Sequence, residues 1–195
     1  MLVRTHWKIS EAIMSSLEAE LVPMINPRSF ELGCVLTDFF WNNPDHTKTK
    51  SFSYLSALIN QLQRRELPFA GRQDKQGFSG KLGITCHYIC DYFCQAHNDP
   101  DYKLFPAHFL YEVRLQMECK KYDLTKLCRS ALKNKDARSD ALLASLPDYI
   151  QTRHLAYISE KPEMKKDIFF AVETSTLFVA SLMNLVNTKC RHQAA

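Results

Sequence analysis

Apolar residues recur every three or four positions along most of this chain, and this periodicity constrains the fold more than any other feature of the sequence. In residues 5–21, for example, Ile9 and Ile13 would lie on the same side of a helix, and residues 50–64 repeat the pattern. No stretch shows the strict alternation of polar and apolar residues that is typical of a β-strand. Only five residues are glycine, which disfavours helix interiors. The sequence therefore predicts an all-α fold.

The chain has 195 residues, which is enough to bury a core as one domain, and neither repeats nor low-complexity linkers divide it. Residues 1–195 are therefore predicted to form a single helical domain of six or seven helices. The expected helices span about residues 5–21, 50–64, 80–96, 106–122, 124–132, 139–159 and 162–187. The segment Glu66–Ser79 mixes proline, glycine and charge, so it is predicted to be a surface loop.

The sequence also bears on the location of the protein. Its first residues lack the basic-then-apolar pattern of a signal peptide, which predicts a cytoplasmic protein. The longest apolar stretch, Ile168–Val186, is interrupted by polar residues such as Glu173, which favours a buried helix over a membrane span. The seven cysteines form no disulfide-like framework, and Cys86, Cys90 and Cys94 recur every four residues, as small apolar side chains do on a buried helix face.

Histidine and acidic residues form two helical pairs. In His87–Asp91 and in His108–Glu112 the carboxylate follows the imidazole by four residues. Four residues span about 400° of helical rotation, so the two side chains of each pair would lie about 40° apart on one helix face. Imidazole nitrogen and carboxylate oxygen are both good zinc ligands, and this spacing lets one rigid helix supply both.

A single pair of this kind is also consistent with a surface ion pair or with a hydrogen-bonded histidine in the core. The surroundings of Asp91 favour a metal ion, because residues 82–94 are largely apolar and contain no Lys or Arg. A carboxylate buried without a cation is costly, and a metal ion would supply the positive charge.

Asp38 and His97 are further candidate ligands. Asp38 is an acid in an apolar setting, although it could instead cap a helix that begins at Phe39. His97 is placed at the end of the helix that carries Asp91, where it could turn toward a second ion held by the His108 pair. The two histidines beyond residue 150 have no acidic pair in a comparable setting and are predicted to be structural or solvent-exposed.

In chain order, the candidate ligands are His6, Asp38, His46, His87, Asp91, His97, His108 and Glu112. This order resembles the ligand set of the bacterial zinc-dependent phospholipase C family, which is related to the single-strand-specific zinc nucleases. The segments that carry the likeness are Thr5-His-Trp-Lys-Ile, Leu32-Gly-Cys-Val-Leu-Thr-Asp-Phe-Phe and Gly83-Ile-Thr-Cys-His-Tyr-Ile-Cys-Asp-Tyr-Phe-Cys-Gln-Ala-His-Asn. They lie within Thr5–Glu112, and the C-terminal helices match the family only as generic helical packing.

The resemblance implies a centre of three zinc ions. It assigns Asp38, His46, His87 and Asp91 to the first ion, His97, His108 and Glu112 to the second, and His6 with the bridging Asp91 to the third. The amine and carbonyl of the N-terminal residue would help to hold the third ion. Secreted members begin at a processed tryptophan, whereas this chain begins at Met1, so two ions are the alternative if the amine is blocked. Water between the first and third ions would be the nucleophile, oriented or deprotonated by Asp38.

The predicted activity is therefore zinc-dependent hydrolysis of phosphodiesters, with phospholipids as candidate substrates. A nuclease or nucleotidase with the same centre and a non-catalytic metal-binding helical protein are the alternatives. A nuclease would stack bases on aromatic side chains. Candidates are Phe39, Phe40, Trp41 and Tyr92, although core packing explains them equally well. The net charge is only +4, without a dense Lys/Arg block, so no stable nucleic-acid partner is expected.

Overall fold

The computed structural model describes residues 1–37, 48–65, 69–133 and 145–193. Within these ranges it contains helices and no β-strand, which confirms the predicted all-α fold. The α-helices are α1 (Val3–Met14), α2 (Pro27–Leu36), α3 (Lys48–Gln63), α4 (Arg72–Tyr92), α5 (Gln95–Asn98), α6 (Phe105–Cys119), α7 (Leu124–Lys133), α9 (Leu146–Ser159) and α10 (Met164–Gln193). The short 3-10 helices are η1 (Val22–Met24) and η3 (Pro100–Tyr102). The described ranges thus hold nine α-helices rather than six or seven, because α2 is a helix of its own and α5 is separate from α4.

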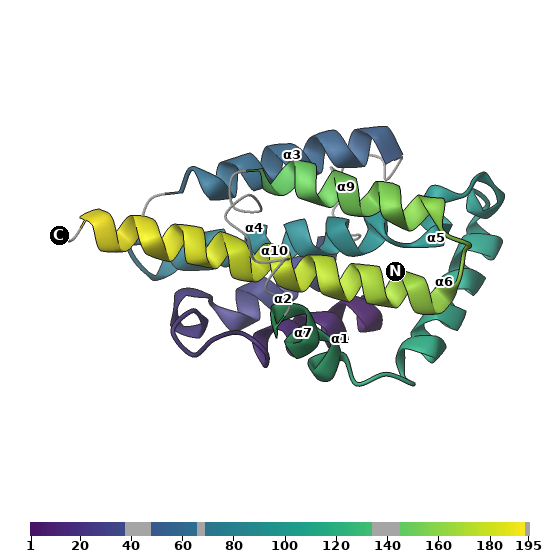
Figure 1. Cartoon of the computed structure of the whole chain (residues 1–195), viewed down its shortest axis with the longest axis horizontal. Helices are drawn as coiled ribbons and strands as arrows, with labels where there is room; N and C mark the ends of the chain where they lie inside the picture. The colour runs from purple at the N-terminus through teal and green to yellow at the C-terminus, as the bar shows by residue number, and fades with distance from the viewer. Residues whose placement is uncertain (38–47, 66–68, 134–144, 194–195) are drawn as a thin grey trace.

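Helix α10 runs along most of the length of the molecule (Figure 1). It contacts α3 and α9 on one side and α1 and α7 on the other, and α6 lies near its N-terminal end. Its segment Met164–Thr188 is long and apolar enough to cross a membrane, but 72% of the apolar window is buried inside the protein. Ile168, Val172 and Phe178 are fully covered, as expected for the buried helix predicted at Ile168–Val186.

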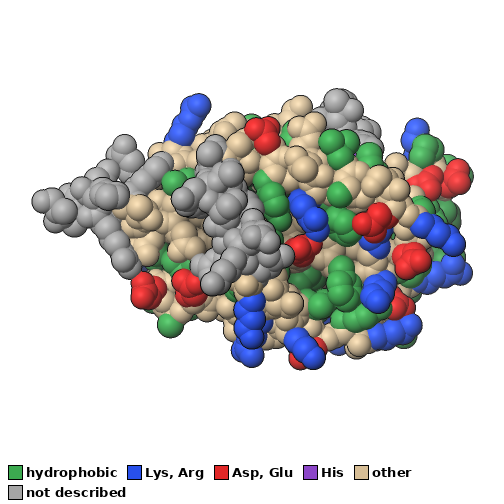
Figure 2. All heavy atoms as spheres, viewed as in Figure 1, with side chains coloured by type: hydrophobic (Ala, Val, Ile, Leu, Met, Phe, Trp, Pro, Cys, Tyr) green, Lys and Arg blue, Asp and Glu red, His purple; other side chains and the backbone are tan. Residues whose placement is uncertain are grey.

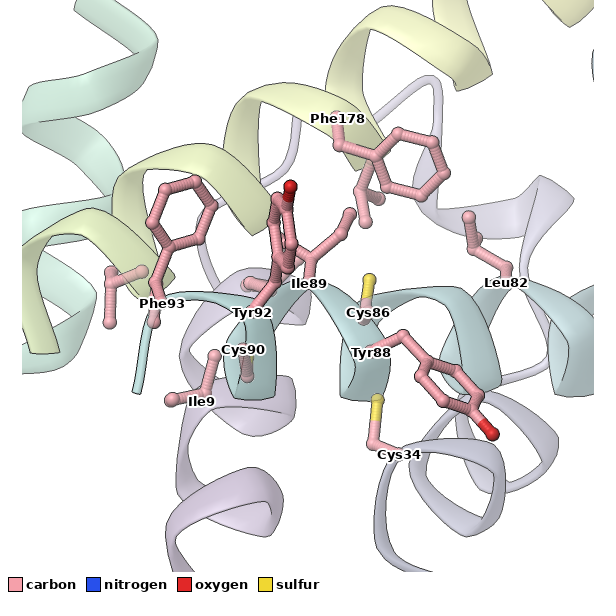
Figure 3. Close-up of a cluster of buried hydrophobic side chains, with 14 of the residues drawn as sticks. Ile9, Cys34, Leu82, Cys86, Tyr88, Ile89, Cys90, Tyr92, Phe93 and Phe178 are labelled. Carbon is pink, nitrogen blue, oxygen red and sulfur yellow. The ribbon is translucent and has the colours of Figure 1, made fainter. Parts of the chain in front are cut away.

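Helix α4 lies between α2 and α10 and forms the centre of the core. In Figure 3 the side chains of Ile89 and Phe93 point toward α10, which carries Phe178, and Cys34 of α2 lies beneath the helix. All of these side chains are buried. The two sides of α4 are therefore covered by different helices, which fixes its rotation about its own axis.

Main-chain contact between α2 and α4 is unusually close. A Cβ atom built on Gly83 would overlap the carbonyl oxygen of Phe30, and one built on Gly33 would overlap the carbonyl oxygen of Gly80. Any residue larger than glycine at these two positions would push the helices apart. Both glycines are therefore explained by this crossing rather than by a turn.

The start of α4 differs from the prediction. The helix begins at Arg72, so residues 72–79 are helical although the sequence predicted a loop there. Gly77 and Gly80 have low helix propensity. Tertiary packing outweighs it, because Phe78 on the same stretch is buried against the ring of Phe69.

The end of α4 differs as well. The helix ends at Tyr92 instead of continuing to residue 96, and the chain is extended at Cys94 before α5 begins. The break depends on a residue far away in the sequence. Asp167 of α10 accepts a hydrogen bond from the backbone N–H of Gln95 at 2.9 Å, so this N–H in the first turn of α5 has a partner. Cys86, Cys90 and Cys94 are all buried as predicted, but Cys94 lies just beyond the helix.

Among the described residues, charged side chains of both signs are interspersed over the face shown in Figure 2, without a large patch of one sign. This agrees with the small net charge of the chain.

Candidate metal centre

Four helices bring six of the eight predicted ligands together. His6 comes from α1, His87 and Asp91 from α4, His97 from α5, and His108 and Glu112 from α6. Asp38 and His46 lie outside the described residues, so their place in the centre stays a prediction.

The most deeply buried group consists of His6, His87 and Asp91. The Nε2 atom of His6 lies 3.3 Å from Asp91 Oδ1, and the Nε2 atom of His87 lies 3.1 Å from Asp91 Oδ2. The two imidazole rings are stacked with their centroids 4.1 Å apart. One ligand atom from each residue lies within 4.8 Å of the other two, so a single cation could contact all three.

The second group surrounds Glu112. Its Oε1 atom lies 3.2 Å from His97 Nε2 and 3.1 Å from His108 Nε2. The sulfur of Cys94 lies close to the same place, within 4.8 Å of ligand atoms of His97 and Glu112. Since His97 Nε2 is also 3.6 Å from Asp91 Oδ1, the two groups form one continuous centre.

Backbone contacts orient the imidazoles. His87 Nδ1 lies 2.9 Å from the carbonyl oxygen of Cys34 in α2, so Nδ1–H donates to this carbonyl and Nε2 is left to face Asp91. The ring of His108 is similarly held by the backbone of Tyr102. This arrangement, in which one ring nitrogen bonds to the protein and the other is available to a cation, is usual for histidine ligands.

The amine of Met1 lies inside the centre. It forms an ion pair with Asp91 and lies 2.7 Å from Glu112 Oε1 and 3.3 Å from His97 Nε2. Burial by itself would lower the pKa of this amine, but Asp91, Cys94 and Glu112 together raise it well above its usual value. The structure therefore places one positive charge between two buried carboxylates.

Four residues of the centre have protonation states that suit metal binding, whereas the hydrogen bond to Glu112 raises the pKa of His108. Burial, followed by repulsion from His87, lowers the pKa of His6 to about 4, and burial also lowers the pKa of His97. Burial alone would raise the pKa of Asp91 and of Glu112, but the Met1 amine and the histidines outweigh it and hold both well below their usual values. At neutral pH these four residues offer neutral imidazoles and ionised carboxylates, the forms that ligate zinc.

The donor set fits zinc on a further observation. Both ring nitrogens of His6 are buried, and neither has a hydrogen-bond partner of suitable geometry among the described residues. Burying a polar atom without a partner costs about 1–3 kcal/mol, and a cation bound between His6 Nε2 and Asp91 would remove this cost at that nitrogen. Nitrogen and oxygen donors in this number are what zinc prefers.

Several residues of the centre were not identified from the sequence. Cys94 was interpreted only as part of an apolar stripe, and the contact of the Met1 amine with Glu112 carries no sequence signal. Asp167 is completely buried and accepts hydrogen bonds from Tyr111 at 2.7 Å and Tyr157 at 2.9 Å, besides the N–H that begins α5. The sequence places Asp167 directly before a long apolar stretch, and this position was the one sign that its carboxylate would be buried.

Asn98 and His154 hold the turn between α4 and α5. The Asn98 side chain donates to the carbonyl oxygens of Tyr92 and Cys94 at 3.0 and 2.9 Å, and it accepts from His154 at 2.9 Å. The His154 ring stacks on Tyr92, with centroids 3.7 Å apart. Tyr92 is only 8% exposed, so this candidate for base stacking is engaged in core packing.

Comparison with known protein families places the chain in its context. The family model for zinc dependent phospholipase C matches residues 5–164. No curated protein and no solved structure matches the chain. The matched region includes every predicted ligand and extends about fifty residues past Glu112, so the C-terminal likeness is broader than the sequence analysis suggested. The chain belongs to the zinc-dependent phospholipase C family.

Proposed function

We propose that this protein hydrolyses phosphodiesters at a centre of two or three zinc ions, and that phospholipids are its substrates. Family membership supports a zinc-dependent phospholipase C-like function. The observation that carries the proposal is the convergence of six predicted ligands from four helices, with nitrogen and oxygen atoms 3.1–3.6 Å apart in a buried centre.

The proposed ligands follow the two groups of the centre. His87 and Asp91, completed by Asp38 and His46, would hold the first ion. His97, His108 and Glu112 would hold the second, and His6, Asp91 and the N-terminal amine, after it has released its proton, would hold the third. Asp91 would be shared, which agrees with its contacts to His6, His87 and His97.

Zinc bound in this centre would supply positive charge to the phosphate oxygens and would favour hydroxide as the attacking species near neutral pH. The protein would keep Asp91 ionised among the histidines and would hold the His87 ring through the Cys34 carbonyl. Asp38 would orient the attacking water or accept its proton.

Exposed apolar residues near the centre support a lipid substrate. His108 is the most exposed of the six described ligands, with 28% of its side chain accessible, so a substrate could approach from its side. The neighbouring Leu104, Phe105 and Phe109 are 75%, 77% and 47% exposed, and the two phenylalanine rings stack on each other. Exposed apolar side chains beside a ligand suit contact with a lipid surface.

Hydrolysis of nucleic acid is less well supported. The described side chains on the face in Figure 2 form no large basic patch, and Tyr92 is engaged in the core. Binding of single strands usually requires a positively charged groove and stacking platforms.

The test combines metal analysis with a substrate panel. Purified protein is expected to contain zinc and to hydrolyse a chromogenic phosphodiester, and a chelator should abolish this activity. Phosphatidylcholine vesicles should be hydrolysed faster than single-stranded DNA or nucleotides. Preferred hydrolysis of DNA would replace the lipid assignment with a nuclease, and zinc without any hydrolysis would indicate a non-catalytic metal protein.

Asp91→Asn tests the shared ligand. It should lose bound zinc and most of the hydrolytic activity, because an amide cannot supply the negative charge that a shared carboxylate gives to two cations. Asp101→Asn is the control, since Asp101 is exposed and lies outside the centre. Full zinc content and full activity in Asp91→Asn would contradict the assignment.

A further inference from the structure

Cys94 occupies a position that its sequence pattern does not explain. It follows α4 by two residues, has an extended backbone with φ −115° and ψ 124°, and is completely buried. This conformation turns the chain between Asp91 at the end of α4 and His97 in α5. The Cys94 side chain therefore lies beside the metal centre rather than on the apolar face of a helix.

Donor atoms around Cys94 are arranged for a cation. Its sulfur, a nitrogen of His97 and an oxygen of Glu112 all lie within 4.8 Å of one another. Ligand atoms bound tetrahedrally to zinc at about 2.0–2.3 Å are about 3.3–3.8 Å apart, so only a small adjustment would bring all three into contact with one ion. The Nε2 atom of His108, 3.1 Å from Glu112 Oε1, is a fourth donor nearby.

Other buried cysteines have different surroundings. The sulfur of Cys90 lies 3.4 Å from the hydroxyl oxygen of Ser175, and Cys86 lies beside Cys34. Among the described residues, Cys94 is the cysteine that a possible metal-binding group includes. Burial therefore does not distinguish Cys94 from the others, but its donor neighbours do.

We propose that Cys94 binds the second cation as a thiolate, together with His97, His108 and Glu112. This inference rests on the proposed zinc centre and adds a ligand to it. Binding would form a sulfur–metal bond and release the thiol proton to solvent. Thiolate and carboxylate together balance the two charges of a zinc ion, which makes burial of this cation less costly.

A fourth protein ligand would give the second cation a different role from the cations held by His6, His87 and Asp91. Three protein ligands leave a position for water or substrate, whereas four protein ligands are typical of structural zinc. The second cation should then be held firmly and act mainly by its charge, and the activated water should belong to the other part of the centre.

Cobalt substitution tests the sulfur ligand directly. Protein freed of metal with a chelator is titrated with Co²⁺, and the wild type should develop a near-ultraviolet sulfur-to-cobalt charge-transfer band. Cys94→Ser should bind cobalt without this band. Its affinity for zinc at the second position should be lower by a factor of about 10–100. Cys90→Ser is the matched control and should keep the band, because Cys90 is equally buried but lies against Ser175.

X-ray absorption at the zinc edge gives an independent measurement. The wild type should show a sulfur neighbour at about 2.3 Å that Cys94→Ser lacks. Bound metal without a sulfur signature in the wild type would overturn the inference, even if Cys94→Ser failed to fold. That result together with normal hydrolysis would leave the proposed function intact, whereas failure to bind any metal would refute both.

Discussion

Glu112 contacts two imidazoles with one oxygen atom, 3.2 Å from His97 Nε2 and 3.1 Å from His108 Nε2. In both contacts a ring N–H can donate a hydrogen bond to the carboxylate, and a bound cation would take the place of these protons. The proposed second ion therefore depends on the charge of this carboxylate more than on either ring.

Glu112→Gln should remove this ion. Because the amide is neutral and can donate a hydrogen bond, we expect loss of about one zinc per chain and a decrease in kcat/KM of at least about 100-fold, or about 2.7 kcal/mol. Zinc content and hydrolysis of a chromogenic phosphodiester measure the two effects. Glu118→Gln on the same helix is the control, since Glu118 pairs with Lys121 away from the centre. Equal zinc content in the two variants would contradict the assignment.

Individual ligands could be predicted from the sequence where the signal was local. His87–Asp91 and His108–Glu112 each share a helix, and their four-residue spacing alone places the two side chains together. The sequence gives no comparable signal for Cys94, whose place beside His97 depends on where α4 ends. Asp38 and His46 lie outside the described residues and stay predictions.

At the scale of elements, the crossing of α2 and α4 positions His87. Gly83→Ala should destabilise the protein by at least about 2 kcal/mol, because the added methyl group would overlap the Phe30 carbonyl oxygen and separate the helices. Gly77→Ala in the same helix is the control. It has open space around its Cα and should be neutral or stabilising by up to about 1 kcal/mol. Denaturant unfolding of both variants provides the comparison, and equal stability would show that the helices can move apart freely.

Helix α6 yields a prediction about lipid contact. Phe105→Ser combined with Phe109→Ser should reduce binding to phosphatidylcholine vesicles and slow their hydrolysis by about tenfold or more, since both rings are exposed beside His108. Hydrolysis of a soluble chromogenic phosphodiester should change little. Met117→Ser, at an exposed apolar position of the same helix, is the control. A parallel loss on both substrates would indicate damage to the centre instead.

Element boundaries were the part of the fold that the sequence predicted least well. Residues 72–79 contain a glycine and several charges, yet packing of Phe78 extends α4 through them. The break after Tyr92 depends on Asp167, more than seventy positions along the chain. Local patterns carry no information about such a contact, whereas the all-α class follows from periodicity alone.

For the molecule as a whole, zinc should be a large contributor to stability. The proposed ions bind only the folded chain, because their ligands come from four helices. Zinc at about 1,000 times its dissociation constant would add about 4 kcal/mol to the free energy of unfolding. Thermal unfolding with zinc and with chelator should show a clear difference in Tm for the wild type and a smaller one for Asp91→Asn. An identical Tm under both conditions would contradict a buried metal centre.

The contact between Gly33 and Gly83 affects which amino-acid substitutions the core can tolerate. Because main chain touches main chain there, no side chain sets the spacing between the Cys34 carbonyl and the His87 ring. Apolar residues elsewhere in the core could therefore be exchanged for others of different shape without altering the direction of this imidazole. Relatives that keep both glycines should tolerate different apolar side chains in the core. A relative that lost either glycine should need another hydrogen-bond acceptor for the His87 ring.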